Sequence, residues 1–150
     1  MYIGKGRNIK KTVNQLFLRT SKKAKIIQNS VVSVSYETTG NELIAQLKFV
    51  QEVNAIKPKF NFKQKPNFTK IEFSNENLLV IDKGRTNGEK SVLLIENTEF
   101  KGFCYTELSY QVNNLKILRK HISPMENSIY NRSIIKKYLQ KNNVEKLIRY

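Results

Sequence analysis

Residues 1–17, MYIGKGRNIKKTVNQLF, decide how the start of this chain folds. Tyr2-Ile3-Gly4 is typical of a strand that runs into a loop, and Asn8 can accept a hydrogen bond from a free amide of a following helix. Apolar residues then recur at helical spacing at Ile9, Val13, Leu16 and Phe17. The stretch therefore predicts a strand, a loop and an amphipathic helix whose outer face carries lysines.

The following segments continue a mixed pattern of helices and strands. Ser21 can cap a second short helix in SKKAKIIQN, and alternating apolar and hydroxyl residues predict a strand over Val31–Glu37. After a turn at Thr39-Gly40-Asn41, ELIAQLKFVQEVNAI predicts a long helix, which Pro58 ends. Residues 62–70 contain a proline and lack periodicity, so we expect a linker there.

Beyond the expected linker, short apolar runs alternate with polar turns. The runs TKIEFS, ENLLVIDKG, KSVLLIEN and FKGFCYTEL predict an antiparallel meander, and Thr86-Asn87-Gly88 supplies the positive φ angles of a tight hairpin. Helices are expected over Asn113–His121 and Ser128–Gln140, divided by Ser123-Pro124. The final VEKLIRY could close the fold as a strand or as a helix end. The predicted fold class is therefore α+β.

The charge of the chain points towards a polyanionic partner. It carries 27 Lys and Arg against 12 Asp and Glu, a formal net charge of +15. Residues 1–65 hold thirteen basic and three acidic residues, whereas residues 66–150 hold fourteen and nine. Lysine-rich and asparagine-rich usage in an AT-biased genome is the alternative explanation, but the clustering favours a basic surface.

Several classes of protein are excluded by composition. The sequence has neither an apolar run that could span a bilayer nor an apolar signal-peptide core, so we expect a cytoplasmic protein without a membrane partner. Cys104 is the single cysteine and His121 the single histidine, which excludes an internal disulfide and argues against zinc. Cys104 lies in an apolar stretch and is expected in the core.

The order and spacing of four segments resemble a known nuclease family. YIGKGRNIKK, the alternating strand, TGNELIAQL and PKFN resemble the GIY-YIG nuclease domain of the excinuclease C type. The resemblance implies a small three-stranded antiparallel sheet flanked by helices over residues 1–61. The family's first strand, ending in Gly-(Ile/Val)-Tyr, has no counterpart. We therefore expect the C-terminal remainder of a longer protein, either a truncated or split reading frame or a natural short paralogue.

The later segments extend the resemblance over nearly the whole chain. LLVIDKGRTNGEKSVLLIENTEFKGF and HISPMEN resemble the C-terminal region of Bacteroidetes proteins that join a DNA polymerase III epsilon-like exonuclease domain to a GIY-YIG domain. This implies a partial GIY-YIG domain over 1–61, a linker over 62–70 and a C-terminal α+β extension over 71–150. The extension is expected to be the meander followed by helices.

The family's catalytic residues are only partly matched. Its YIG tyrosine corresponds to Tyr2 and its asparagine to Asn61, whereas its arginine and its metal-binding glutamate fall on Thr12 and Phe49. Threonine cannot neutralise phosphate charge, and phenylalanine offers no oxygen to a hard cation. We therefore expect Tyr2 and Asn61 to be vestigial and no metal to be bound, with Mg²⁺ or Mn²⁺ needed only for residual activity.

Two charged residues near these positions are weaker candidates. Arg7 could replace the missing arginine, and Glu52 lies one helical turn from Phe49. Arg7 more simply faces solvent or a DNA phosphate, and Glu52 more simply lies on a solvated helix face.

We expect the chain to have kept DNA binding although it has lost cleavage. Free amides at the start of the first helix favour phosphate, and basic side chains gather around the first two helices. The candidate DNA-binding residues are Lys5, Arg7, Lys10, Lys11, Lys22, Lys23 and Lys25. A solvated lysine face is the alternative for any single residue.

Two functions are thus predicted from the sequence. The first is a degenerate, DNA-repair-associated nuclease-family protein that mainly binds DNA. The alternative is an accessory fragment whose Tyr2-Ile3-Gly4 pairs with a strand of an upstream exonuclease fragment. Aromatic side chains at Phe100, Phe103 and Tyr105 could stack on bases or, more simply, pack one face of a sheet.

Overall fold

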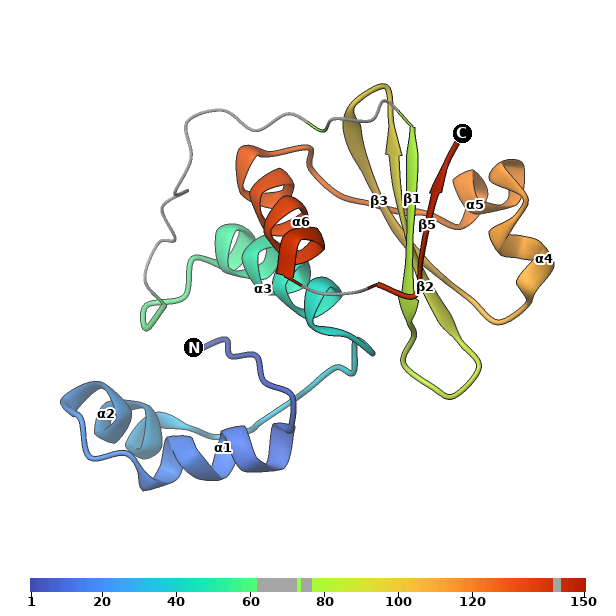
Figure 1. Cartoon of the computed structure of the whole chain (residues 1–150). Coiled ribbons are helices and arrows are strands. Elements are labelled where there is room, and N and C mark those ends of the chain that lie inside the picture. Colours follow the sequence, from blue (N-terminus) through green and yellow to red (C-terminus); the bar gives the residue numbers. More distant parts are fainter. Residues whose placement is uncertain (62–72, 74–76, 142–143) are drawn as a thin grey trace.

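The computed structural model describes residues 1–61, 73, 77–141 and 144–150 and has an α+β fold, as predicted (Figure 1). A five-stranded antiparallel sheet has the strand order β4-β3-β2-β1-β5. Its strands are β1 Leu78–Lys83, β2 Lys90–Glu96, β3 Glu99–Thr106, β4 Ser123–Pro124 and β5 Lys146–Arg149.

The central strands form a meander through a longer turn over residues 84–89 and a tight turn over residues 97–98. Gly88 has a φ of +88° in the β1–β2 turn, where the Gly84 amide donates to the Glu89 carbonyl over 2.9 Å. Asn97 and Thr98, between β2 and β3, have φ angles of 51° and 63°. Positive φ at both central residues matches the twist of an antiparallel hairpin. The predicted turn at Asn87-Gly88 is present, but only Gly88 takes the positive φ angle that was expected of both residues.

One face of the sheet packs against two long helices, α3 (Glu42–Ile56) and α6 (Ile129–Lys141), which lie side by side (Figure 1). The buried side chains of this layer alternate along the strands and recur along the helices, as period-2 and period-3.6 packing requires. The core includes Leu43, Leu47, Val80, Leu93, Phe100, Phe103 and Ile135. Residues of α3 therefore share a core with the sheet.

The opposite face is covered by α4 (Ser109–Val112) and α5 (Leu115–His121). Leu118 of α5 packs with the strand residues that point to this second face. Among them are Leu79, Ile81, Val92, Leu94 and Cys104. Cys104 is 2% exposed, which confirms its predicted place in the core, and burial raises the pKa of its thiol to about 11. The sheet thus has an apolar core on each face.

A bulge in β3 determines which residues reach each core. Leu94 lies opposite Gly102 and Ile95 opposite Phe100, so Lys101 is an extra residue in the ladder. Gly102 takes a φ of +141°, a conformation that side chains rarely adopt. The bulge brings Phe100 and Phe103 to the same face, where both are buried. The packing interpretation is therefore correct for these two aromatic residues.

The first two helices form a hairpin that lies apart from the sheet at the lower left of Figure 1. They are α1 (Ile9–Leu18) and α2 (Lys22–Ser30), and their predicted caps are present at Asn8 and Ser21. Gln28 of α2 donates from its side-chain amide to the carbonyls of Leu16, Phe17 and Arg19 at the end of α1. One neutral side chain therefore joins the two helices.

The predicted strand over Val31–Glu37 is wrong. The segment pairs with no described strand, and Val32 is 99% exposed. Tyr2-Ile3-Gly4 also forms no strand, because the Ile3 backbone bonds to the Asn61 side chain. A β-pattern becomes a strand only where a neighbouring backbone completes its hydrogen bonds.

Other predicted elements need smaller corrections. The helix expected from Asn113 begins at Leu115, and α4 precedes it without having been predicted. Ser123-Pro124 forms the short edge strand β4, and the C-terminal segment adds β5 to the sheet. The linker at 62–70 and most of the run TKIEFS lie outside the described residues. The division into residues 1–61, 62–70 and 71–150 stays a prediction.

Candidate nucleic-acid interface

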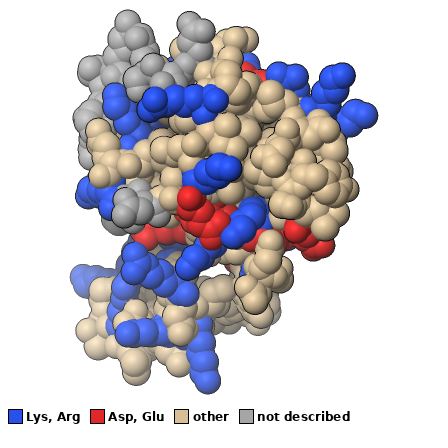
Figure 2. All heavy atoms as spheres, turned by 45° about the vertical axis from the view of Figure 1, so that its right-hand side comes forward, with Lys and Arg blue, Asp and Glu red and all other residues tan. Residues whose placement is uncertain are grey.

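The α1–α2 hairpin and the segments beside it are strongly cationic. Residues 1–36 contain no Asp or Glu, and the first acidic residue along the chain is Glu37. Figure 2 shows Lys and Arg over the lower lobe, which is this hairpin, and acidic side chains above it. The basic residues of this region are Lys5, Arg7, Lys10, Lys11, Arg19, Lys22, Lys23 and Lys25.

The Asn8 cap fixes where α1 begins relative to its first lysines. The Asn8 side chain accepts from the Lys11 amide over 2.9 Å, and α1 therefore begins immediately before Lys10 and Lys11. Both lysines are exposed and line a shallow hollow along α1 with Asn14, Gln15 and Leu18. A helix start favours anions through its free amides and its dipole. Lys10 and Lys11 add positive charge to the positive end of this helix.

The predicted basic residues differ in their contacts. Arg7 pairs with Glu42 of α3 at 3.0 Å, and the Lys23 ammonium lies 5.4 Å from the ring centroid of Tyr2. The other five are exposed and form no ion pair with any residue that the structure describes. These five are Lys5, Lys10, Lys11, Lys22 and Lys25. Their charges are available to an external anion.

The structure brings the two predicted catalytic positions into one neighbourhood. The Ile3 amide donates to Asn61 Oδ1 over 3.0 Å, and Asn61 Nδ2 donates to the Ile3 carbonyl over 2.8 Å. Tyr2, the next residue, is 36% exposed. The side-chain amide of Asn61 thus bonds to both backbone polar groups of Ile3. A catalytic role for Tyr2 and Asn61 stays a prediction.

The residues at the other two catalytic positions do not fit the chemistry of the family. The Thr12 hydroxyl donates to the Asn8 carbonyl over 2.9 Å, and Phe49 is half-buried on α3. Glu52 is exposed on the same helix. Among the described residues there is no group of three or more His, Cys, Asp or Glu that could hold a metal ion. Whether the chain binds a divalent cation stays a prediction.

Sequence reasoning missed three side chains near Asn61. Lys59 and Phe60 lie in a turn closed by the Asn61 amide, which donates to the Pro58 carbonyl over 3.1 Å. With Lys23 and Ile26 of α2 they line an open hollow of about 250 Å³. The aromatic residue next to a lysine in PKFN was the available signal, but nothing local indicates that α2 lies next to it.

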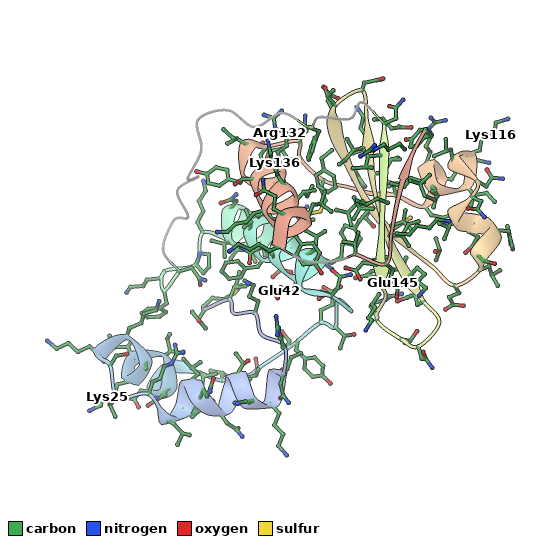
Figure 3. The ribbon with its side chains drawn as sticks, viewed as in Figure 1. Lys25, Glu42, Lys116, Arg132, Lys136 and Glu145 are labelled. Atoms are coloured by element: carbon green, nitrogen blue, oxygen red, sulfur yellow. The ribbon has the colours of Figure 1, made fainter. Side chains whose placement is uncertain are left out.

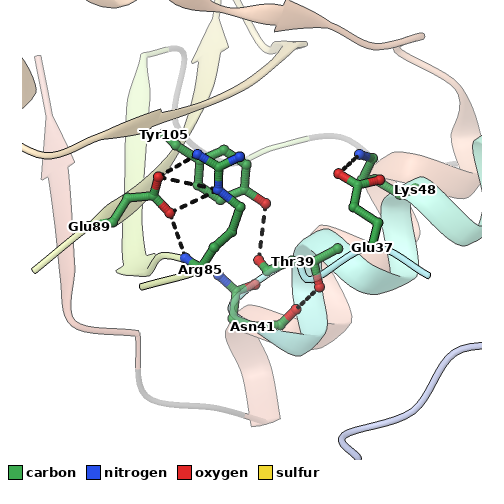
Figure 4. Close-up of polar contacts among 7 residues, drawn as sticks. All are labelled: Glu37, Thr39, Asn41, Lys48, Arg85, Glu89 and Tyr105. Carbon is green, nitrogen blue, oxygen red and sulfur yellow. Dashed lines mark hydrogen bonds and ion pairs between the residues drawn. The ribbon is translucent and has the colours of Figure 1, made fainter. Parts of the chain in front are cut away.

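A second polar cluster holds the chain at the entrance to α3 (Figure 4). Glu89 is buried and accepts from the Arg85 guanidinium at 2.6 Å, which lowers the pKa of Glu89. That guanidinium lies 4.2 Å from the ring centroid of Tyr105, whose hydroxyl donates to the Thr39 carbonyl. Burial raises the pKa of Tyr105 to about 12. These contacts give Arg85 a structural role in joining the turn before β2 to Glu89 and Tyr105.

Part of the chain is similar to a protein of the UvrABC system in two bacteria. The relatives are UvrABC system protein C of Borrelia duttonii (strain Ly) and of Borrelia recurrentis (strain A1). Each is 38% identical over 66 residues, which cover 43% of this chain and 11% of the relative. The chain therefore spans about a tenth of the length of these relatives. This agrees in part with the resemblance to the excinuclease C type.

The other comparisons limit that conclusion. No protein-family model matches the chain, and no solved structure does. The assignment to the GIY-YIG domain stays a prediction. Within the described residues, every helix is too short or too polar to cross a membrane.

Proposed function

We propose that this chain is a DNA-binding protein related to excinuclease C, and that its α1–α2 hairpin contacts the phosphate backbone. One observation carries the proposal: residues 1–36 contain eight Lys and Arg and no acidic residue. Such a surface binds phosphate with little dependence on sequence, because the energy comes largely from counterion release. The similarity to UvrABC system protein C supports a role in DNA repair.

Cleavage by this chain alone is proposed to be absent or very weak. Thr12 and Phe49 supply neither a cation for the phosphate nor an oxygen for a metal ion. Incubation with supercoiled plasmid and Mg²⁺ or Mn²⁺ should leave the plasmid intact. Cleavage that is lost in Tyr2→Phe would overturn this part of the proposal, and binding can be tested separately.

Binding is tested by fluorescence anisotropy with a labelled duplex at low salt. The expected result is saturable binding that weakens as salt is added, without preference between two unrelated duplex sequences. The absence of binding at low salt would overturn the proposal. A clear preference for one sequence would also contradict it, because phosphate contacts do not read base identity.

A second candidate function rests on the unpaired segment Val31–Tyr36. Val32, Val34 and Tyr36 alternate along it and are 99%, 56% and 71% exposed. An exposed segment of this pattern can pair with a strand of another polypeptide. The proposed partner is the upstream fragment carrying an exonuclease domain, which would pair here and not, as expected from the sequence, with Tyr2-Ile3-Gly4, because the Ile3 backbone bonds to Asn61. Co-expression should then slow amide hydrogen exchange over Val31–Tyr36, and unchanged exchange would exclude this pairing.

A further inference from the structure

The hollow beside Asn61 is built from two segments that are distant in the sequence. Lys23 and Ile26, one turn apart on α2, form one side, and Lys59, Phe60 and Asn61 form the other. Tyr2 adjoins them, because Lys23 lies 5.4 Å from its ring centroid and Asn61 bonds to Ile3. One aromatic ring, one aliphatic side chain, two ammonium groups and one amide therefore line a single open site, and the Tyr2 ring lies beside Lys23.

Each component of this hollow matches a part of an unpaired nucleotide. Phe60 and Ile26 offer apolar surface to the face of a base, and base–aromatic stacking accepts every base. Lys23 and Lys59 can neutralise the flanking phosphates. The Asn61 amide bonds to Ile3 through one donor and one acceptor, which leaves a second hydrogen and a second lone pair for a base edge.

Size and position favour a nucleotide within a strand over a free cofactor. The volume of about 250 Å³ lies below the roughly 300–1,000 Å³ of pockets that enclose whole small-molecule ligands. The hollow is open, so a polynucleotide chain could enter and leave it. Lys23 and Ile26 belong to α2, the helix that also carries Lys22 and Lys25 of the cationic surface. A strand lying on the hairpin would thus pass the hollow.

We infer that this hollow receives one unstacked base of single-stranded DNA, with Phe60 as the stacking platform and Lys23 and Lys59 as phosphate contacts. The inference rests on the proposed DNA binding and makes it more specific. It predicts a preference for DNA that contains unpaired nucleotides over a fully paired duplex. Lys59 and Phe60 then act in binding without taking part in any cleavage chemistry.

The chain contains no tryptophan, which allows a direct test. Phe60→Trp keeps an aromatic platform and places a single fluorophore in the hollow. Titration with a short oligothymidylate should quench its emission, and a blunt duplex should quench it much less. Tyr110→Trp is the matched control, because Tyr110 is 60% exposed on α4, on the other side of the sheet. Its emission should change little with either DNA.

A second variant tests the site without changing Phe60, which is half-buried. Lys59 is exposed, so Lys59→Gln should fold normally, and it should weaken oligothymidylate binding measurably more than duplex binding. Phe60→Ala should lower oligothymidylate affinity by roughly tenfold, the scale of one stacked base. Circular dichroism of each variant checks that α1–α3 persist.

The outcomes separate this inference from the proposed function. If duplex binds in a salt-dependent way but oligothymidylate quenches neither tryptophan variant, the hollow does not hold a base and only this inference fails. Equal quenching in Phe60→Trp and Tyr110→Trp also overturns it. If neither DNA binds at low salt, the proposed function fails as well. The site is supported if oligothymidylate quenches only the Phe60→Trp variant and binds Lys59→Gln more weakly than the unmodified protein.

Discussion

Replacing Lys10 and Lys11 together by Ala should reduce the salt dependence of DNA binding in a calculable way. Five predicted basic residues are exposed and form no ion pair with a described residue: Lys5, Lys10, Lys11, Lys22 and Lys25. If each neutralises one phosphate, the logarithmic slope of affinity against salt is about −4.5. Between about 50 and 200 mM salt the affinity should then fall about 500-fold.

The double variant Lys10→Ala, Lys11→Ala should show a slope of about −2.7 and a fall of about 40-fold over the same range. Alanine is the best helix former, so α1 should persist. The assay is anisotropy of a labelled duplex across a salt series. The matched control is Lys116→Ala, Lys120→Ala, which also removes two exposed lysines, from α5. Figure 3 shows Lys116 and Lys25 at opposite ends of the molecule.

The control should retain the slope of the unmodified protein. Equal loss of slope in the two double variants would mean that net charge alone drives binding, and the assignment to the α1–α2 hairpin would be wrong. A slope near zero in the unmodified protein would refute phosphate contact by these lysines altogether.

Three further perturbations test contacts elsewhere in the fold. Gly40→Ala would put a Cβ 2.0 Å from a backbone oxygen of the β1–β2 hairpin at a φ of +78°, so urea denaturation should show a loss of about 2 kcal/mol or more. Arg85 lowers the pKa of Glu89 from its ordinary 4.5. The carboxylate therefore stabilises the fold above pH 4.5, and this stabilisation is lost as the pH falls through the lowered folded-state pKa. Glu89→Gln should make the free energy of unfolding less dependent on pH in that range. An unchanged pH dependence would contradict the linkage. Asn61→Ala removes two hydrogen bonds to Ile3, each worth about 1 kcal/mol, and should speed exchange of the Ile3 amide.

The first three helices were predictable because their signals are local. Asn8, Ser21 and Asn41 each cap a helix by accepting from an amide three residues later, and this chemistry is contained in the sequence itself. The lysines around α1 and α2 could be selected for the same reason. That they cluster can be inferred from the positions of the two helices alone, without knowing how the rest of the chain packs.

Features that join distant segments could not be predicted. The alternation over Val31–Glu37 indicates a strand, but strand formation depends on a pairing partner that the pattern does not contain. The extra residue at Lys101 and the φ of Gly102 become visible only when β2 and β3 are paired. The hollow beside Asn61 requires α2 to meet the turn after α3, and no local signal specifies that meeting.

The ion pair between Arg7 and Glu42 has a consequence for how readily this surface accepts a ligand. Its side chains are 88% and 48% exposed, and such pairs contribute only about 0–1 kcal/mol. Glu42 also lies in the first turn of α3, where the helix end itself favours a carboxylate. A phosphate group could therefore exchange places with Glu42 at Arg7 and leave that carboxylate in a favourable setting. If the hairpin binds DNA as proposed, Arg7 would be neutralised by Glu42 in the free protein and would pair with a phosphate in the complex.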